Sequence, residues 1–139
     1  MSKVLAEPSR PVEDWRLVLD AWIAEVAQVV GQAKAWADKR GWATKEDQKR
    51  ITEGGLGTYE APRLLIHTPQ GRLLLDPVAR DVVGAAGRLD FCAMPSYDSV
   101  PLVKEEGHWR FFSVARTDLH LPWSEEAFEK VAQELLQLQ

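Results

Sequence analysis

The chain has 139 residues, of which 45% are hydrophobic and 27% are charged, a composition that indicates one globular domain and excludes a disordered or fibrous protein. Its 21 acidic side chains outnumber its 17 lysine and arginine side chains, and the resulting formal net charge of −4 disfavours nucleic acid as a partner, because binding to phosphates normally needs a basic surplus. Cys92 is the only cysteine, so an intramolecular disulfide and a cysteine metal cluster are excluded.

The N-terminal region carries no recognisable targeting signal. Residues 1–8 lack an apolar core and include an acid, unlike a secretory signal peptide. No apolar run approaches the ~20 residues that a membrane-spanning helix needs. We therefore expect a soluble, cytoplasmic protein with no membrane partner, in which residues 1–10 form a flexible leader and residues 11–139 form a single α+β domain.

A long amphipathic helix is predicted over residues 11–40. Proline suits its first position, and Lys39 and Arg40 followed by Gly41 are a typical helix end. Apolar residues recur at alternating spacings of four and three, which places them on one stripe: Trp15, Leu19, Trp22, Val26, Val29, Ala33 and Trp36.

Residues 42–62 allow two interpretations. Thr44 and Asp47 could cap a short helix, but the polar stretch up to Glu53 fits an edge strand equally well. A glycine-rich connector then follows over residues 54–57, and Pro62 is expected to end it.

A β-hairpin follows, because the hydrophobic period changes to two over residues 64–68 and 72–75, which flank a Pro-Gln-Gly turn. After it, Asp76 and Pro77 match the cap and first position of a helix, and Gly84 matches its end. We therefore predict a short helix at residues 77–83, with Asp76 in a capping role.

Three more strands are expected over residues 88–94, 100–104 and 108–114, and a C-terminal helix begins after Ser124. Trp123 and Phe128 have the spacing of a hydrophobic staple around that cap. The predicted fold class is α+β, with the long N-terminal helix and the C-terminal helix packed on one face of a mainly antiparallel sheet of about five strands.

The two faces of the predicted sheet differ. One is consistently apolar and should meet the helices: Leu89, Phe91, Ala93, Leu102, Trp109 and Phe111. The other is mixed, and it carries more apolar side chains than a face meant only for water: Leu65, His67, Leu74, Asp90, Cys92, Met94, Val103, His108, Arg110 and Phe112.

Several groups of residues allow both a chemical and a structural interpretation. Cys92 with His67 or His108 would make a nucleophile and base, but a half-buried strand cysteine explains Cys92 better. Asp76, Asp90 and Glu25 would resemble a metal-dependent nuclease site, but the strand of Asp90 lacks the lysine of that pattern. The three histidines share no zinc-ligand spacing, and the glycine-rich segment lacks the lysine of a phosphate loop. We expect no metal and no cofactor.

In architecture, size and charge, though in no motif, the chain resembles small secretion chaperones and toxin-immunity proteins, a resemblance that implies protein binding. The leading hypothesis is a non-catalytic protein-interaction module that binds a protein partner or forms a homodimer. The alternative is a small-molecule-binding protein or enzyme with a site around five residues: His67, Asp90, Tyr97, His108 and Arg110. A metal-dependent nuclease is a more distant alternative.

Overall fold

The fold is that of an α+β protein with six strands, as seen in a computed structural model that describes the backbone of residues 2–81 and 85–139 and the side chains of residues 15–81 and 85–139. Helix α1 (Ser2–Lys39) precedes an antiparallel sheet, and helix α2 (Glu125–Gln137) follows it. The strands pair in chain order: β1 (Ala43–Glu53), β2 (Gly57–Thr68), β3 (Gly71–Ala79), β4 (Arg88–Met94), β5 (Asp98–Glu105) and β6 (His108–Phe111). Within the described ranges, neither helix combines the length and hydropathy needed to cross a membrane.

Helix α1 begins earlier than its apolar stripe predicts and ends where the sequence places its end. It starts at Ser2 rather than near Pro11, and the predicted flexibility of residues 1–10 stays a prediction. At the other end, Gly41 adopts a φ of 76°, and the amides of Gly41 and Trp42 donate to the carbonyls of Asp38 and Ala37. These two bonds form a Schellman motif, which needs a left-handed residue at the position of Gly41.

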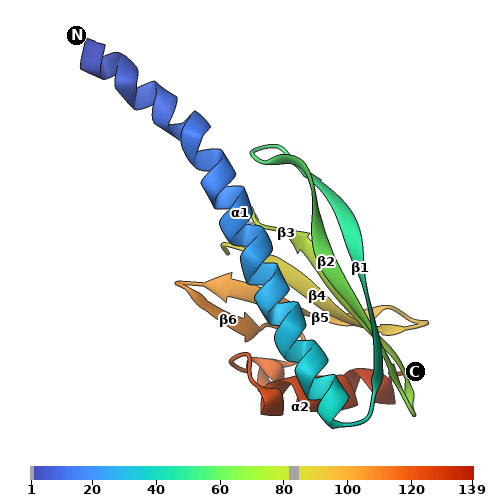
Figure 1. Cartoon of the computed structure of the whole chain (residues 1–139). Helices are drawn as coiled ribbons and strands as arrows, with labels where there is room; N and C mark the ends of the chain where they lie inside the picture. The colour runs from blue at the N-terminus through green and yellow to red at the C-terminus, as the bar shows by residue number, and fades with distance from the viewer. Residues whose placement is uncertain (1, 82–84) are drawn as a thin grey trace.

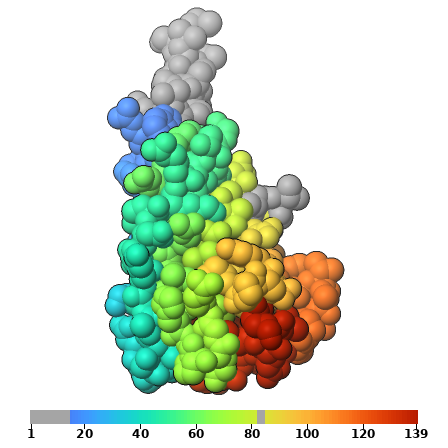
Figure 2. Space-filling view, turned by 90° about the vertical axis from the view of Figure 1, so that its right-hand side faces the viewer, coloured from blue at the N-terminus to red at the C-terminus, as the bar shows by residue number. Residues whose placement is uncertain are grey.

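Both helices lie on one side of the sheet, which confirms the predicted arrangement. Helix α1 crosses β1 and β2, and α2 packs against β3, β4 and β5 (Figure 1). The β2–β3 turn lies beside the red C-terminal end of the chain (Figure 2). A β carbon added at Gly71 in this turn would lie 3.3 Å from Leu136 of α2. Rows of buried side chains run across the strands toward the helices: Leu64, Leu75, Phe91 and Val100 in one row, and Leu89, Leu102 and Phe111 in another.

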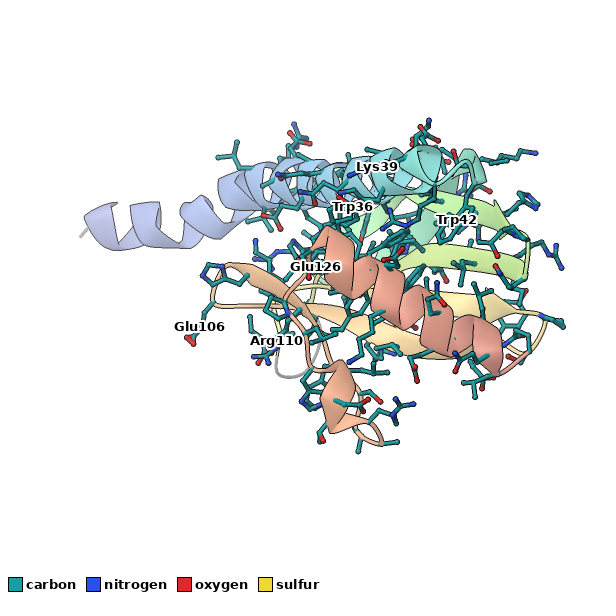
Figure 3. The ribbon with its side chains drawn as sticks, turned by 90° about the horizontal axis from the view of Figure 1, so that it is seen from below. Trp36, Lys39, Trp42, Glu106, Arg110 and Glu126 are labelled. Atoms are coloured by element: carbon teal, nitrogen blue, oxygen red, sulfur yellow. The ribbon has the colours of Figure 1, made fainter. Side chains whose placement is uncertain are left out.

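An aromatic cluster joins the two helices to the sheet. Trp36 points into the space between α1 and α2 (Figure 3), where its ring centroid lies 5.0 Å from that of Trp123 and 5.5 Å from that of Phe128. Phe128 also stacks on Phe91 of β4 at 5.4 Å. Large aromatic rings bury much apolar area at once, so the packing of this cluster helps to hold both helices on the sheet. Arg40 adds ion pairs to Glu125 and Glu129 of α2.

Helix α2 has the cap and the staple that the sequence predicts. The Ser124 hydroxyl accepts a hydrogen bond from the Ala127 amide at 3.1 Å. Trp123 and Phe128 meet edge to face across this first turn, with centroids 6.1 Å apart. The cap satisfies an amide that has no partner inside the helix.

Replacing Ser124 by alanine should therefore lower the free energy of unfolding by about 1 kcal/mol, because the Ala127 amide loses its acceptor. Ser124→Asp is the matched control and should keep the stability of the parent, since aspartate caps equally well. Urea unfolding followed by circular dichroism measures both. Equal losses in the two variants would contradict the capping role.

The prediction of a short helix at residues 77–83 is wrong for residues 77–81, which the structure describes. Pro77 and Ala79 belong to β3 and pair with Leu89 and Arg88 of β4, and residues 80–81 form a bend; residues 82–84 lie outside the described residues. Asp76 is consequently not a helix cap. Its cross-strand pairing with β4 outweighs a local capping preference that is worth only about 1 kcal/mol.

Of the two interpretations of residues 42–53, the edge strand is the correct one. β1 pairs along its whole length with β2, and its polar side chains suit an edge that must not attract another strand. Pro62 does not end the connector as expected, because β2 runs through it. From Arg63 back to Gly57, β2 pairs with β1 alone, and the consecutive residues Ala61 and Pro62 are both buried.

A buried carboxylate anchors the free end of this β1–β2 hairpin. Glu53 accepts hydrogen bonds from the amides of Arg80 and Asp81, both at 2.9 Å, and from the Tyr59 hydroxyl. That hydroxyl also accepts a hydrogen bond from the indole of Trp22 on α1 at 2.9 Å. Burial and the Glu53 contact raise the pKa of Tyr59, so it stays protonated and keeps donating.

Candidate functional site

The uncovered side of the sheet, here called the outer face, carries the mixed set of side chains. Because side chains alternate along a strand, the positions between the buried rows point away from both helices. Cross-strand register arranges them in four rows, which are His67–Arg72–Met94, then Leu65–Leu74–Cys92–Ser99, then Asp76–Asp90–Pro101, and last Arg88–Val103–Arg110. In Figure 3, Arg110 lies below the sheet, on the side away from Trp36.

Two carboxylates face each other at the centre of the outer face. Asp76 and Asp90 are direct cross-strand partners, an arrangement of like charges that is unfavourable without compensation. Arg88 compensates Asp90 through two hydrogen bonds of 2.8 and 3.3 Å. Lys49 reaches from β1 over its small partner Ala61 and places its ammonium 3.0 Å from Asp76 Oδ1. That ammonium donates its hydrogen bond to the Pro77 carbonyl, so the contact with Asp76 is an ion pair only.

Cys92 lies beside these carboxylates and is buried although it is on the outer face. Burial raises its pKa to about 12, with further contributions from the negative charges of Asp90 and Asp76. A thiol with such a pKa is protonated at neutral pH and is therefore a poor nucleophile. The chemistry of Cys92 is that of a small apolar side chain.

The raised pKa of Cys92 predicts a loss of stability at alkaline pH. Above pH ~9 the unfolded thiol ionises while the folded thiol does not, so unfolding becomes more favourable as the pH rises towards about 12. One such group changes the unfolding free energy by at most about 1.4 kcal/mol per pH unit. Cys92→Ser should lose stability less steeply than the parent in urea titrations between about pH 8 and pH 11. Parallel curves would show that Cys92 makes no such contribution.

The five residues of the predicted ligand site do not all meet. His67 lies in the first outer row, at the end of the sheet where the exposed Tyr97 occupies the β4–β5 turn. His108 lies at the opposite end, in the first position of β6, with Arg110 two residues along. Asp90 sits between the two ends, in its ion pair with Arg88. The structure thus brings together only His108 and Arg110.

These two residues border a groove between α1 and β6, with a volume of about 690 Å³. Its floor includes Val29 and the half-buried rings of Trp109 and Trp123. At one end Lys104 is ion-paired with Glu25 at 2.8 Å, and elsewhere the Trp123 indole donates to Gln32. The groove therefore has an apolar floor and polar sides, and the ion pair of Lys104 with Glu25 leaves neither of these two charges free for a ligand.

The described residues form neither the proposed metal-dependent nuclease site nor the proposed pair of Cys92 with His67. Glu25 is on the helix side of the sheet and binds Lys104, whereas Asp76 and Asp90 are on the outer face, so the three carboxylates do not converge. No group of three or more potential metal ligands occurs among the described residues. His67 stands two strands away from Cys92 and in a different row, so the two do not form a nucleophile and base pair.

Sequence reasoning missed the cations that organise the outer face. Lys49, Arg63 and Arg88 each pair with an aspartate there, and hydrogen bonding to Arg63 lowers the pKa of Asp47. A signal existed for Arg88, because the period-two alternation of residues 88–94 puts it on the same face as Asp90. The residues of β1 carried no such signal, because a polar edge strand has no apolar alternation from which a face can be read.

Comparisons with known proteins add no assignment. No protein-family model matches the chain, and neither a curated protein nor a solved structure matches it.

Proposed function

We propose that the protein is a non-catalytic protein-interaction module that binds its partner with the outer face of the sheet. The observation that carries this proposal is the placement of both helices on one side, which leaves partly exposed apolar side chains without a covering layer. They are Leu65, Leu74, Met94, Val103 and Phe112, of which Phe112 is partly covered by the stacked ring of His120. Sheet faces that retain apolar side chains in contact with water are typical of interaction surfaces.

The chemistry of this face supports binding rather than catalysis. Its carboxylates Asp76 and Asp90 are ion-paired, and its thiol is held protonated. A catalytic site instead needs a nucleophile or base within hydrogen-bonding reach of its partner. A lone reduced cysteine also suits a cytoplasmic location, because thiols are kept reduced there.

The direct test is site-specific photo-crosslinking in cells. A photoreactive phenylalanine derivative at Met94 on the outer face should produce one discrete adduct with a polypeptide. The same group at Gln133, exposed on α2, is the matched control and should produce none. Adducts from neither position, or equally from both, would contradict the use of the outer face.

Light scattering tests whether the partner is a second copy of the chain. A homodimer would double the mass of 15.7 kDa at micromolar concentration. A Phe112→Asp variant should then restore the monomer, because it places a charge in the apolar contact. A monomeric parent would exclude the homodimer and leave a different polypeptide as the partner.

A second candidate function is small-molecule binding in the groove beside His108. Its volume of about 690 Å³ falls in the range of ligand sites. Titration with a panel of small aromatic acids, followed by the indole NMR signals of Trp109 and Trp123, tests it. Saturable shifts that disappear in His108→Ala would support the groove as a binding site, and unchanged signals would exclude it for this class of ligand.

A further inference from the structure

The outer face is basic, although the chain as a whole is acidic. Register and alternation place more cations than carboxylates there. The cations are Lys45, Lys49, Arg63, Arg72, Arg88 and Arg110, and the carboxylates are Asp47, Asp76, Asp90 and Glu105. Glu53 has the same alternation on β1 but is buried against Tyr59, so it is not available to a partner. Since the formal net charge of the chain is −4, the excess of acid must lie elsewhere.

Ion pairing within the outer face leaves more of its described cations than carboxylates without a partner. Three of the carboxylates are matched by Arg63, Lys49 and Arg88 at distances of 2.8 to 3.0 Å. Among the described residues, Lys45, Arg72 and Arg110 make no ion pair, and all three are exposed. Glu105, at the tip of the β5–β6 hairpin, is the one carboxylate of the set without such a partner. The charge available to a partner is therefore positive.

On the opposite side of the sheet, helix α2 carries an excess of negative charge. Helix α2 has four glutamates and one lysine, and Glu126 projects from its first turn (Figure 3). Two of these glutamates bind Arg40 of α1, and Glu134 binds Arg116. Helix α2 is thus acidic where the outer face is basic, and the outer face is the one with uncovered apolar side chains.

We infer that the partner of the outer face is an acidic polypeptide that places carboxylates against Arg72, Arg110 and Lys45. This inference rests on the proposed function and names the chemistry of its partner. Complementary charge steers association and selects among partners, while the apolar rows of Leu65, Leu74 and Cys92 supply buried area between the basic ends. Arginine is well suited to this role because its planar guanidinium binds a carboxylate through two hydrogen bonds.

The same charges argue against two other occupants. A second copy that docked its own outer face would bring two surfaces of the same net positive charge together, which costs free energy. A nucleic acid would bring phosphates against Asp76 and Asp90 at the centre of the face, and single-stranded bases would find few aromatic rings on which to stack. An acidic polypeptide can instead direct its carboxylates to the ends and its apolar side chains to the middle.

The test measures binding of the whole protein to short poly-L-glutamate, with poly-L-lysine and an oligo-dT of equal length as comparison probes. Fluorescence anisotropy at low salt should detect poly-L-glutamate and neither comparison probe, and binding should weaken at physiological salt because exposed charges are screened. Arg72→Glu and Arg110→Glu should each weaken binding by about tenfold, equivalent to about 1.4 kcal/mol. Lys130→Glu is the matched control, since it makes the same charge change on exposed α2, and it should leave binding unchanged.

Several results would overturn the inference. They are no binding of poly-L-glutamate, equal or tighter binding of oligo-dT or poly-L-lysine, insensitivity to the two arginine variants, and a doubled mass in light scattering. The crosslinking experiment at Met94 separates this failure from failure of the proposed function, because it does not depend on the charge of the partner. An adduct at Met94 without poly-L-glutamate binding would refute the acidic partner alone, and the absence of an adduct would refute the outer face as the binding surface.

Discussion

Replacing Phe128 by alanine should lower the free energy of unfolding by about 4 kcal/mol. The ring is fully buried and contacts aromatic rings from three parts of the fold. Its centroid lies 5.4 Å from Phe91 of β4, 5.5 Å from Trp36 of α1 and 6.1 Å from Trp123. Truncation would leave a cavity that rigid tryptophan neighbours cannot fill, so the cavity cost adds to the lost transfer free energy.

Urea unfolding monitored by tryptophan fluorescence measures this effect. Gln133→Ala, at an exposed position of the same helix, is the matched control and should change stability by less than about 0.5 kcal/mol. Phe128→Leu should fall between the two, because it retains part of the buried volume. A loss below about 1 kcal/mol for Phe128→Ala would show that the aromatic cluster does not hold the helices on the sheet.

Replacing Gly87 by alanine should cost about 3 kcal/mol, because the added methyl group has no room. A β carbon at this position would lie 2.5 Å from Cζ3 of Trp22 and 3.2 Å from Cη2 of Trp109. Trp22 is almost fully buried and is held by its hydrogen bond to Tyr59, so its ring cannot move aside. The glycine therefore permits the close approach of α1 to the start of β4.

Gly31→Ala is the matched control for this substitution. Gly31 lies in α1 with no atom within 4 Å of an added β carbon, so alanine should stabilise the protein by up to about 1 kcal/mol through its helix propensity. In a Trp22→Leu background the cost of Gly87→Ala should fall, because the smaller side chain removes the closest contact, although the contact with Trp109 remains. Equal costs in both backgrounds would assign the effect to the backbone of Gly87 rather than to Trp22.

The helices and the apolar side of the sheet could be predicted from the sequence because each depends on a repeating local pattern. The stripe through Trp22, Val26 and Val29 identifies the buried face of α1, since the helical period brings these residues together wherever the helix packs. Ser124 with Phe128 likewise marks the start of α2 within one turn. The alternation of Leu89, Phe91 and Ala93 identifies the face that meets the helices.

Tertiary pairing decided the segments whose local signals were weak or misleading. Asp76 and Pro77 have the chemistry of a helix start, yet hydrogen bonding to β4 makes them part of a strand, because a ladder of backbone bonds outweighs one cap. The polar residues of β1 contain no period at all, and only pairing with β2 makes them a strand. Intrinsic preferences of this size are routinely overridden by long-range contacts.

The sequence likewise predicted one property of the candidate binding surface, and the tertiary structure decided another. The sequence alone indicated that one face of the sheet is mixed, because alternation places Asp90, Cys92 and Met94 together on β4. It did not indicate that this face is basic, since the charge of a face depends on which strands lie side by side and in what register. Lys49 meets Asp76 across the intervening β2. Arg72 and Arg110 stand on one face without ion-pair partners among the described residues only because β3 and β6 belong to the same sheet.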